Sequence, residues 1–400
     1  EAAALVDRAV DLFAAEVGLD AVEVRQRNLI ARDEFPWTSA TGLVYDSGDY
    51  RRALDLALAT VGYDDLRDEQ ARRRAQPEAT AFLGIGVSVF IDRTAGVRGS
   101  EYGSVALRPD GSALVRTGSS PYGQGHHTAW AMLVADRTGI PLERIEVVHG
   151  DTDVVPRGGI TGGSRSAQKA GSAIVEASDA LVDEARRIAA SLLEAADADV
   201  VLDIAGGRFH VVGAPGATTV TWSDVAASLG ADGPGLQCES DFAGEGPTFP
   251  FGVYVVVVEV DAGTGAVTLR RVVTVDDAGT VLNPMLALGQ VHGGLAQGLA
   301  QGLFEEFAYD DEGNPRTSSF ADYMIPSAAD LPSFECLLTE TPSPNNPMGF
   351  KGIAESGTIG GPPAVQNAVV DALAHLGVRH LDLPITPERV WRAISAAAAS

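Results

Sequence analysis

Residues 347–363 read PMGFKGIAESGTIGGPP, and this stretch decides how the rest of the chain is interpreted. Five of its residues are glycines, which permit positive φ angles and a close approach of the backbone to a ligand. Pro362 and Pro363 are expected to open a helix, since a proline in the first turn loses no hydrogen bond. Apolar residues at helical spacing follow from Val365 to Leu376, so the loop should be anchored by a packed helix.

Glu355 is the one carboxylate in this loop, and the residue pattern leaves two interpretations open. In the first, Glu355 caps the helix or pairs with Lys351. In the second, it is a buried base whose pKa is raised by its apolar surroundings.

Composition limits the classes of function. A chain of 400 residues predicts two or three domains, and the net charge of −25 argues against nucleic acid and anionic membranes as partners. Cys238 and Cys336 lack metal-ligand spacing and predict reduced thiols in the cytoplasm. The apolar run Tyr254–Val260 is too short to span a membrane. Because the sequence starts at Glu1 inside an amphipathic helical pattern, we expect a piece of a longer protein.

The organisation along the chain predicts helices up to residue 77 and a mixed region from 78 to 400, divided near 250. Two strand, glycine-loop, helix units follow each other, with loops at Gly118–His126 and Gly158–Ser166. A long buried hairpin is expected from strands at 252–261 and 266–276. Glycine loops of this kind expose N–H groups where a helix begins and favour an anion there.

Arg165 is the only lysine or arginine at these two helix starts. It is either a ligand for a phosphate or a pterin, or the partner of a neighbouring carboxylate. His126 and His127 are not expected to form a metal pair, because adjacent residues on a helix point apart.

A helix that opens at Asn283-Pro284 contains five glycines, namely Gly289, Gly293, Gly294, Gly298 and Gly302. Each costs about 1 kcal/mol relative to alanine, so a closely approaching backbone or a rigid ligand must compensate. Gln290, Gln297 and Gln301 also lie on it and could bind the edge of a pterin ring. For Gln297 and Gln301, tight packing against a sheet is the preferred interpretation.

Five motifs in a fixed order resemble the molybdenum-binding large subunit of the xanthine dehydrogenase/aldehyde oxidase family of molybdenum hydroxylases. They are Gly123-Gln124-Gly125-His126, Gly150-Asp151-Thr152-Asp153, Gly162-Gly163-Ser164-Arg165-Ser166, Asn283-Pro284 with Gly289-Gln290, and Lys351-Gly352-Ile353-Ala354-Glu355. The resemblance covers nearly the whole chain and corresponds to the C-terminal portion of that subunit. It implies an α+β fold of two mixed α/β molybdopterin-binding subdomains whose glycine-rich loops converge on the cofactor. Residues 1–77 would then comprise the end of the first molybdopterin-binding domain and linker helices, and residues 78–400 the second such domain, with two subdomains divided near 250.

The same resemblance implies a molybdenum cofactor whose metal is held by the pterin dithiolene and not by a protein atom, in the cytosine dinucleotide form. Glu355 would be the catalytic base in the oxidative hydroxylation of an aldehyde or N-heterocycle, with water as the oxygen source. Electrons would leave through iron-sulfur clusters and FAD on an iron-sulfur subunit and an FAD subunit. The residues implied around the cofactor are Gln124, Gly125, His126, Gly163, Ser164, Arg165, Ser166, Gln290, Lys351 and Gly352.

Two departures from the family pattern leave alternatives open. Ala354 stands where the family has a second glycine, which would cost roughly 1 kcal/mol if that position had positive φ. The N-terminal half of the family's large subunit is absent and would have to be a partner. The alternatives are a carbon monoxide dehydrogenase type of large subunit and a non-catalytic scaffold that binds the cofactor without turnover.

Overall fold

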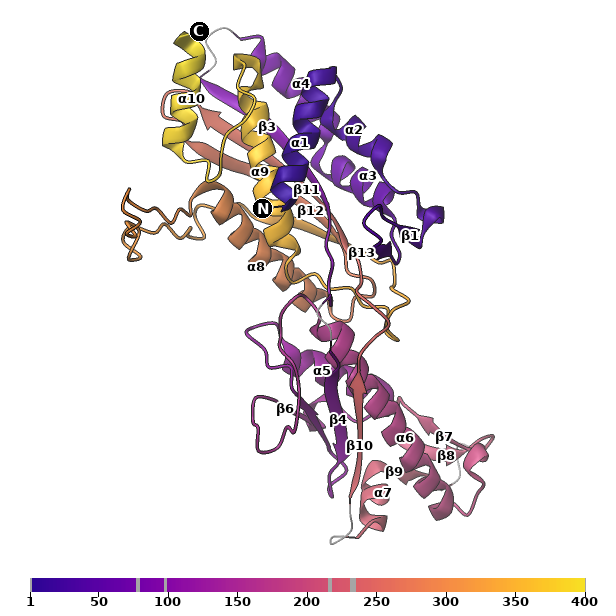
Figure 1. Cartoon of the computed structure of the whole chain (residues 1–400). Coiled ribbons are helices and arrows are strands. Elements are labelled where there is room, and N and C mark those ends of the chain that lie inside the picture. The colour runs from indigo at the N-terminus through magenta and orange to yellow at the C-terminus, as the bar shows by residue number, and fades with distance from the viewer. Residues whose placement is uncertain (1, 77–79, 97–98, 215–217, 231–234, 400) are drawn as a thin grey trace. The chain divides into compact units, whose positions relative to one another are not determined.

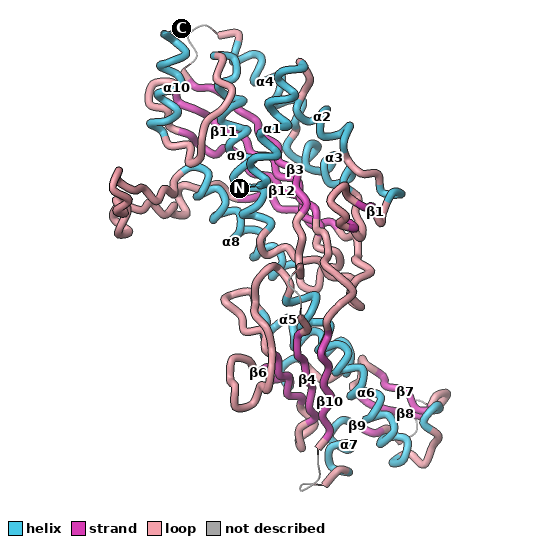
Figure 2. The backbone as a smooth tube through the Cα atoms, viewed as in Figure 1, coloured by secondary structure: helices cyan, strands magenta, loops and turns pink. Residues whose placement is uncertain are grey.

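The computed structural model describes residues 2–76, 80–96, 99–214, 218–230 and 235–399, and it divides the chain into two compact units. Unit 1 comprises residues 1–93, 249–342 and 353–400, and unit 2 comprises residues 94–248 and 343–352. Each unit combines helices with a four-stranded sheet (Figures 1 and 2). The predicted α+β class is confirmed. The boundary expected near residue 78 falls inside unit 1, since α4 packs on β3 there.

Unit 1 is a sheet with helices on both faces, and the sheet order is β13-β12-β11-β3. Its strands are β3 (Ala81–Ile91), β11 (Phe251–Asp261), β12 (Val267–Asp277) and β13 (Phe334–Thr339), with a short pair β1 (Trp37–Thr38) and β2 (Val44–Tyr45). Its helices are α1 (Ala2–Val17), α2 (Ala21–Asn28), α3 (Tyr50–Val61), α4 (Tyr63–Arg74), α8 (Pro284–Leu303), α9 (Ser356–Leu373) and α10 (Pro387–Ala399).

Strand β11 forms the centre of this unit because its valines are buried on both sides. Tyr254 and Val256 point into the core shared with α8 and α9, whereas Val253 and Val255 point into the core shared with α3. An unbroken run of β-branched residues is typical of a strand that is covered on both faces.

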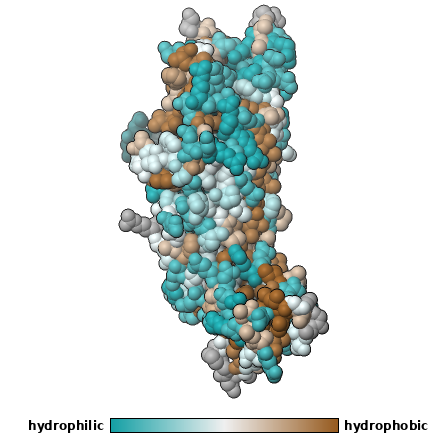
Figure 3. All heavy atoms as spheres, turned by 90° about the vertical axis from the view of Figure 1, so that its right-hand side faces the viewer, coloured by the Kyte–Doolittle hydropathy of each residue, from teal (hydrophilic) through white to brown (hydrophobic). Residues whose placement is uncertain are grey.

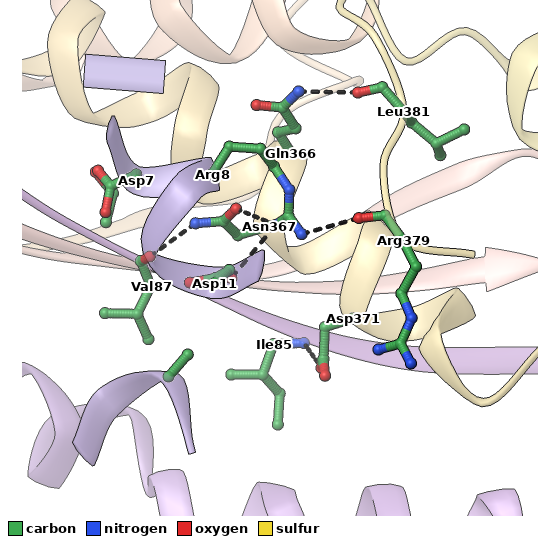
Figure 4. A network of polar contacts seen from close by, with 12 residues as sticks. Asp7, Arg8, Asp11, Ile85, Val87, Gln366, Asn367, Asp371, Arg379 and Leu381 are labelled. Carbon is green, nitrogen blue, oxygen red and sulfur yellow. Dashed lines mark hydrogen bonds and ion pairs between the residues drawn. The ribbon is translucent and has the colours of Figure 1, made fainter. Parts of the chain in front are cut away.

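Helix α1 is fixed to α9 and β3 by a polar network, drawn in Figure 4. The Arg8 guanidinium of α1 donates to Asn367 Oδ1 of α9 at 2.5 Å and to the Arg379 carbonyl at 3.1 Å. Asn367 Nδ2 in turn donates to the Val87 carbonyl at 3.1 Å. The neighbouring Asp7 accepts from Arg25 of α2 at 2.6 Å. One face of α1 therefore packs against the other elements of unit 1.

The predicted start of α9 is wrong. The helix begins at Ser356, and Pro362 and Pro363 lie inside it instead of opening it. The two prolines forfeit helical hydrogen bonds, which would ordinarily bend or end the helix. They sit where the glycines of α8 make room, since a Cβ on Gly298 would lie 3.1 Å from Pro362 Cδ. Packing against a neighbouring helix therefore outweighs the local preference.

Unit 2 has a four-stranded sheet in the order β10-β4-β5-β6 and a small three-stranded sheet, β7-β8-β9. Its strands are β4 (Glu101–Leu107), β5 (Ala113–Thr117), β6 (Ile145–Val148), β7 (Val200–Asp203), β8 (Arg208–Val211), β9 (Val220–Thr221) and β10 (Leu236–Phe242). Its helices are α5 (His126–Thr138), α6 (Ser172–Leu192) and α7 (Trp222–Ser228), and a π-helical turn at Ala167–Gly171 precedes α6. Helix α6 packs on β4 and β10.

The surface agrees with the acidic composition without being uniformly polar. Figure 3 shows hydrophilic residues over much of the visible face, interrupted by hydrophobic patches. Within the described residues, no helix has the length and apolar character needed to cross a membrane. Cys238 and Cys336 are both free thiols, and both are half-buried.

Asp276 of β12 is a fully buried carboxyl group whose ionisation opposes folding. Its Oδ1 accepts from the Tyr254 hydroxyl at 3.0 Å, and within the described part of the chain its Oδ2 has no partner. Burial raises the pKa of Asp276 from 3.8 to about 7. Because the folded-state pKa lies above the unfolded one, this group's contribution to stability is lost as pH rises through that interval.

We therefore expect Asp276→Asn to stabilise the chain more at pH 8 than at pH 5.5. The wild-type carboxyl should lose about 2 kcal/mol across that interval, which the neutral amide does not lose. Urea unfolding at the two pH values measures the difference, and Asp311→Asn on the exposed turn is the control. An equal effect of Asp276→Asn at both pH values would contradict a raised pKa at this carboxyl.

Candidate functional site

Glu355 lies at the N-cap position of α9, and its side chain is exposed. Its carbonyl accepts from the Ile359 amide at 3.2 Å and from the Thr358 hydroxyl at 2.8 Å, but its carboxylate makes no capping bond to the helix. The interpretation of Glu355 as a side-chain cap therefore does not hold. The other interpretation, a buried base, does not describe Glu355 in this chain alone, because its side chain is exposed to solvent.

The Glu355 loop is supported by backbone-to-backbone packing between α8 and α9. A Cβ on Gly298 would lie 2.4 Å from the Gly357 carbonyl oxygen, and one on Gly294 would lie 3.0 Å from Gly357 Cα. The first distance is too short for a side chain, and the second would require the neighbouring backbone to shift by a few tenths of an ångström. The expectation that a closely approaching backbone compensates for glycine in this helix is confirmed at these two positions.

The opposite face of α8 is open. A Cβ on Gly289 or Gly293 would meet nothing within 4 Å. Gln297 and Gln301 are exposed on this helix, so the expectation that they pack against a sheet is wrong. Gln290 is half-buried, one turn before Gly294. It therefore reaches solvent at the same end of α8 that supports the Glu355 loop.

Ala354 does not strain the loop. Among the described residues other than glycine, positive φ occurs at Ala95, Ser164 and Glu194, and Ala354 is not one of them. The cost expected for an alanine at that position therefore does not arise. Backbone strain at Ala354 thus gives no support to a defective, non-catalytic loop.

Three loops of unit 2 come together. The Thr161 hydroxyl donates to the Ser120 carbonyl at 2.6 Å, which joins the two glycine loops predicted from the sequence. The third loop ends at Lys351-Gly352, where a Cβ on Gly352 would lie 2.0 Å from the Ser164 carbonyl oxygen. The predicted residues Gly163, Ser164, Ser166 and Gly352 therefore lie side by side, and Lys351 beside them is buried.

Ser164 adopts a left-handed conformation with φ of 49°, directly after Gly163 with φ of 66°. Such a conformation in a residue with a side chain costs free energy and is concentrated at ligand-binding loops. Gln168 holds the turn, because its Nε2 donates to the Ser164 carbonyl at 2.9 Å. The loop is thus pre-shaped before α6 begins.

Gly123 and Gly163 have positive φ angles, and the space beside their Cα atoms is open. A Cβ on either residue would meet nothing within 4 Å, and their φ angles are 104° and 66°. Within the described ranges, no residue accepts a hydrogen bond from either amide. Open amides on glycine loops that precede helices are suited to an anionic ligand such as a phosphorylated cofactor.

His126 and Gln124 are both tied to their own loop. His126 is buried, and its Nδ1 lies 3.1 Å from the Ser119 carbonyl. Because that carbonyl can only accept, Nδ1 carries the proton and Nε2 is left as an acceptor. Burial lowers the pKa of His126, which favours this neutral form. Gln124 Oε1 accepts from the Tyr122 amide at 2.5 Å.

Arg165 is the partner of a buried carboxylate, the second of the two roles considered for it. Its Nη2 donates to Glu101 Oε2 at 2.7 Å and its Nε to the Ile160 carbonyl at 3.1 Å. Both side chains of the pair are almost fully buried. Glu101 Oε1 also accepts from the Gly159 amide at 2.8 Å. The pair clamps the glycine loop onto β4, and no local pattern singles out Glu101, which lies far away along the chain.

Replacing Glu101 by glutamine should loosen this loop. Arg165 would then stay buried without a counter-charge, at a cost of about 2 kcal/mol. Amide hydrogen exchange of residues 158–166 should accelerate, and urea unfolding should report the loss. Glu239→Gln is the matched control, because Glu239 pairs with Arg157 at an exposed site where solvent screens the pair and a much smaller loss is expected. Equal effects of the two substitutions would contradict a clamping role.

No described group of three or more histidine, cysteine, aspartate or glutamate side chains could hold a metal ion. His127 and His149 do meet, with their Nε2 atoms 2.8 Å apart, but they form only a pair. Two sets of candidate residues therefore stand in the two units. Unit 2 contains the glycine loops, and unit 1 contains Glu355 and Gln290.

The family of molybdopterin cofactor-binding domains matches residues 56–332. The large chain of carbon monoxide dehydrogenase from Hydrogenophaga pseudoflava is 39% identical over 98% of this chain and 51% of its own length. The large subunit of nicotine 6-hydroxylase from Paenarthrobacter nicotinovorans is 36% identical over 96% of this chain and 48% of its own length. The xanthine dehydrogenase molybdenum-binding subunit of Escherichia coli O157:H7 is 30% identical over 96% of this chain and 51% of its own length.

Solved structures give the same result. CO dehydrogenase from Oligotropha carboxidovorans superimposes with a TM-score of 0.94 at 35% identity, over 100% of this chain and 51% of that one. Quinoline 2-oxidoreductase from Pseudomonas putida 86 superimposes with a TM-score of 0.90 at 34% identity, over 98% of this chain and 52% of that one. The chain spans about half the length of the relatives it matches. It belongs to the molybdopterin cofactor-binding domain family.

Proposed function

We propose that this chain is the C-terminal part of the large subunit of a molybdenum hydroxylase that hydroxylates an aldehyde or an N-heterocycle. The observation that carries the proposal is the position of Glu355, presented to solvent on a loop that backbone packing against α8 holds in place. Relatives named for nicotine hydroxylation and quinoline oxidation support an N-heterocyclic substrate. The non-catalytic alternative loses one of its two supports, because Ala354 is unstrained.

Glu355 acts as the base. The overall change replaces a substrate C–H bond by C–OH, takes the oxygen from water, and releases two protons and two electrons. Glu355 accepts one of the protons, and its fixed backbone limits the positions from which it can do so. When bound, the molybdenum–pterin group supplies the acceptor for the two electrons.

The cofactor is held by the residues that the resemblance implies, and we propose its cytosine dinucleotide form. The open amides of the glycine loops fit its phosphate groups. Gln124, Gly125, His126, Gly163, Ser164, Ser166, Lys351 and Gly352 line it in unit 2, and Gln290 in unit 1. Arg165 positions its loop through Glu101. Two free thiols favour a cytoplasmic location.

The partners complete the enzyme. We propose that the other half of the molybdenum subunit closes the site, and that an iron-sulfur subunit and an FAD subunit carry the electrons away. The length of the relatives supports the first of these, since this chain covers only about half of each.

The proposal is tested on an isolated, assembled complex that contains this chain. Molybdenum is measured by elemental analysis, the pterin nucleotide by its release on acid treatment, and turnover by reduction of a dye with aldehydes and N-heterocycles. We expect stoichiometric molybdenum, cytidine monophosphate and substrate-dependent reduction. A complex with neither metal nor pterin would refute the proposal, whereas a loaded complex without turnover would favour the scaffold.

Carbon monoxide oxidation is the second candidate. It is favoured by the 39% identity with a carbon monoxide dehydrogenase large chain and by the TM-score of 0.94 with a CO dehydrogenase. Dye reduction under carbon monoxide, with no organic substrate added, distinguishes it from the first candidate.

A further inference from the structure

A groove of about 1360 Å³ runs through unit 1 beside the start of α9. Its walls are α1, α2, the end of β3 and the first turn of α9, and Gln301 of α8 reaches it as well. Thr358 and Ile359 line it one turn after Glu355. Whatever fills this groove therefore lies next to the candidate base.

The α1 wall of the groove is apolar and exposed. Ala2, Leu5, Val6, Ala9, Val10 and Phe13 line it. They recur at helical spacing and form one stripe along the helix. Leu5 is 74% exposed, Val6 62% and Phe13 57%. Single exposed apolar residues are ordinary, but a continuous stripe along a groove indicates an interaction surface.

Asp92, at the end of β3, is a carboxylate lining the groove that an apolar ligand would not satisfy. Its Oδ1 accepts from the Arg93 amide at 2.7 Å, and among the described residues its buried Oδ2 has no partner. Burial is the main cause that raises the pKa of Asp92 to about 6, and the negative charge of Glu355 contributes less. Arg25, a cation that lines the same groove, is already bound to Asp7 and Asp11.

We infer that this groove docks an apolar polypeptide segment that carries a cation or another hydrogen-bond donor for Asp92, and that the segment comes from the other half of the molybdenum subunit. The inference rests on the proposed function. It also rests on charge complementarity, because a buried carboxylate oxygen requires a donor that the described chain does not supply. The relatives are about twice as long as this chain, so they contain additional polypeptide from which such a segment could come.

This docking has a consequence for the candidate base. A segment seated beside Thr358 and Ile359 would adjoin Glu355, which this chain alone leaves exposed. The other half of the subunit thus serves as a wall of the site. Its cation or hydrogen-bond donor stabilises Asp92, a carboxylate that repels the like charge of Glu355.

The direction in which Asp92→Asn changes the melting temperature tests whether a docked segment supplies a donor to Asp92. In the 400-residue chain, the substitution removes a buried unpaired charge and should raise the melting temperature by about 2 °C. In the assembled complex, it removes the partner of the docked donor and should lower the melting temperature by a similar amount. A change of the same sign in both samples would overturn the inference. Asp311→Asn, on an exposed turn, should have no effect in either sample.

A photo-crosslinker at Phe13 identifies the occupant directly in the assembled complex. We expect adducts with the other half of the molybdenum subunit, and no such adduct from a crosslinker at Val212, an exposed residue of unit 2. Adducts with a second copy of this chain or with the iron-sulfur or FAD subunit, or no adduct at all, would each overturn the inference. Molybdenum and turnover are measured on the same preparation. A complex that gives the expected adduct but contains no molybdenum would contradict the proposed function and leave the docking standing.

Discussion

Glu355→Gln in the assembled enzyme is expected to lower kcat by roughly 10²- to 10⁴-fold, the range that a positioned general base contributes. Glutamine keeps the size of the side chain and can still accept a hydrogen bond, but it cannot take up a proton at neutral pH. Because the carboxylate makes no capping bond to α9, the helix and the loop should stay intact. Dye reduction under saturating substrate measures the loss.

The comparison needs a control and a check on the cofactor. Glu143→Gln, an exposed glutamate of unit 2, should leave turnover unchanged. Molybdenum content should be equal in wild type and both variants, so that a lost rate is assigned to proton transfer and not to assembly. Full turnover by Glu355→Gln would remove this residue from the chemistry.

Gly298→Val is expected to have the largest effect on stability. The Cβ would lie 2.4 Å from the Gly357 carbonyl oxygen and 3.1 Å from Pro362 Cδ, and α9 cannot move away without opening the core of unit 1. Overpacking against backbone costs roughly 3 kcal/mol or more, since no flexible side chain is available to give way. Urea unfolding of the 400-residue chain measures it.

Gly293→Ala on the same helix is the matched control. Its Cβ would meet nothing within 4 Å, so only the helix propensity changes, and the variant should gain about 0.5–1 kcal/mol. The two substitutions are little more than one turn apart and should act in opposite directions. A loss of stability in both variants would show that the glycines serve something other than contact with α9.

Local sequence information is sufficient where the structure depends on local contacts. The long hairpin is predicted to within one residue at each strand end, because its turn at Asp261–Gly265 combines glycines with two buried valine-rich runs. The close approach at Gly294 and Gly298 is predicted because repeated glycine destabilises a helix unless a neighbouring group fills the space. By contrast, β10 is missed, since this edge strand alternates polar residues with few apolar ones.

The remaining features depend on contacts that no spacing reveals. Pro362 lies inside α9 only because α8 offers a glycine surface. Arg165 pairs with Glu101, which lies 64 positions away in the sequence. Asp92 is notable only once its orphan oxygen is seen in the groove. The candidate site is therefore predictable as a set of loops, whereas the polar contacts that shape them require coordinates.

The way the chain leaves and re-enters unit 1 affects the order in which the protein can form during synthesis. Strand β3 pairs with β11, and Ile91 lies opposite Phe251, a separation of 160 positions (251 − 91). The ribosome must therefore synthesise all of residues 94–248 before edge strand β3 can pair with β11 in the unit 1 sheet. Closing so long a loop is slow, and the unpaired edge of β3 is exposed to association in the meantime. Early folding of unit 2 would shorten the effective tether and reduce that exposure.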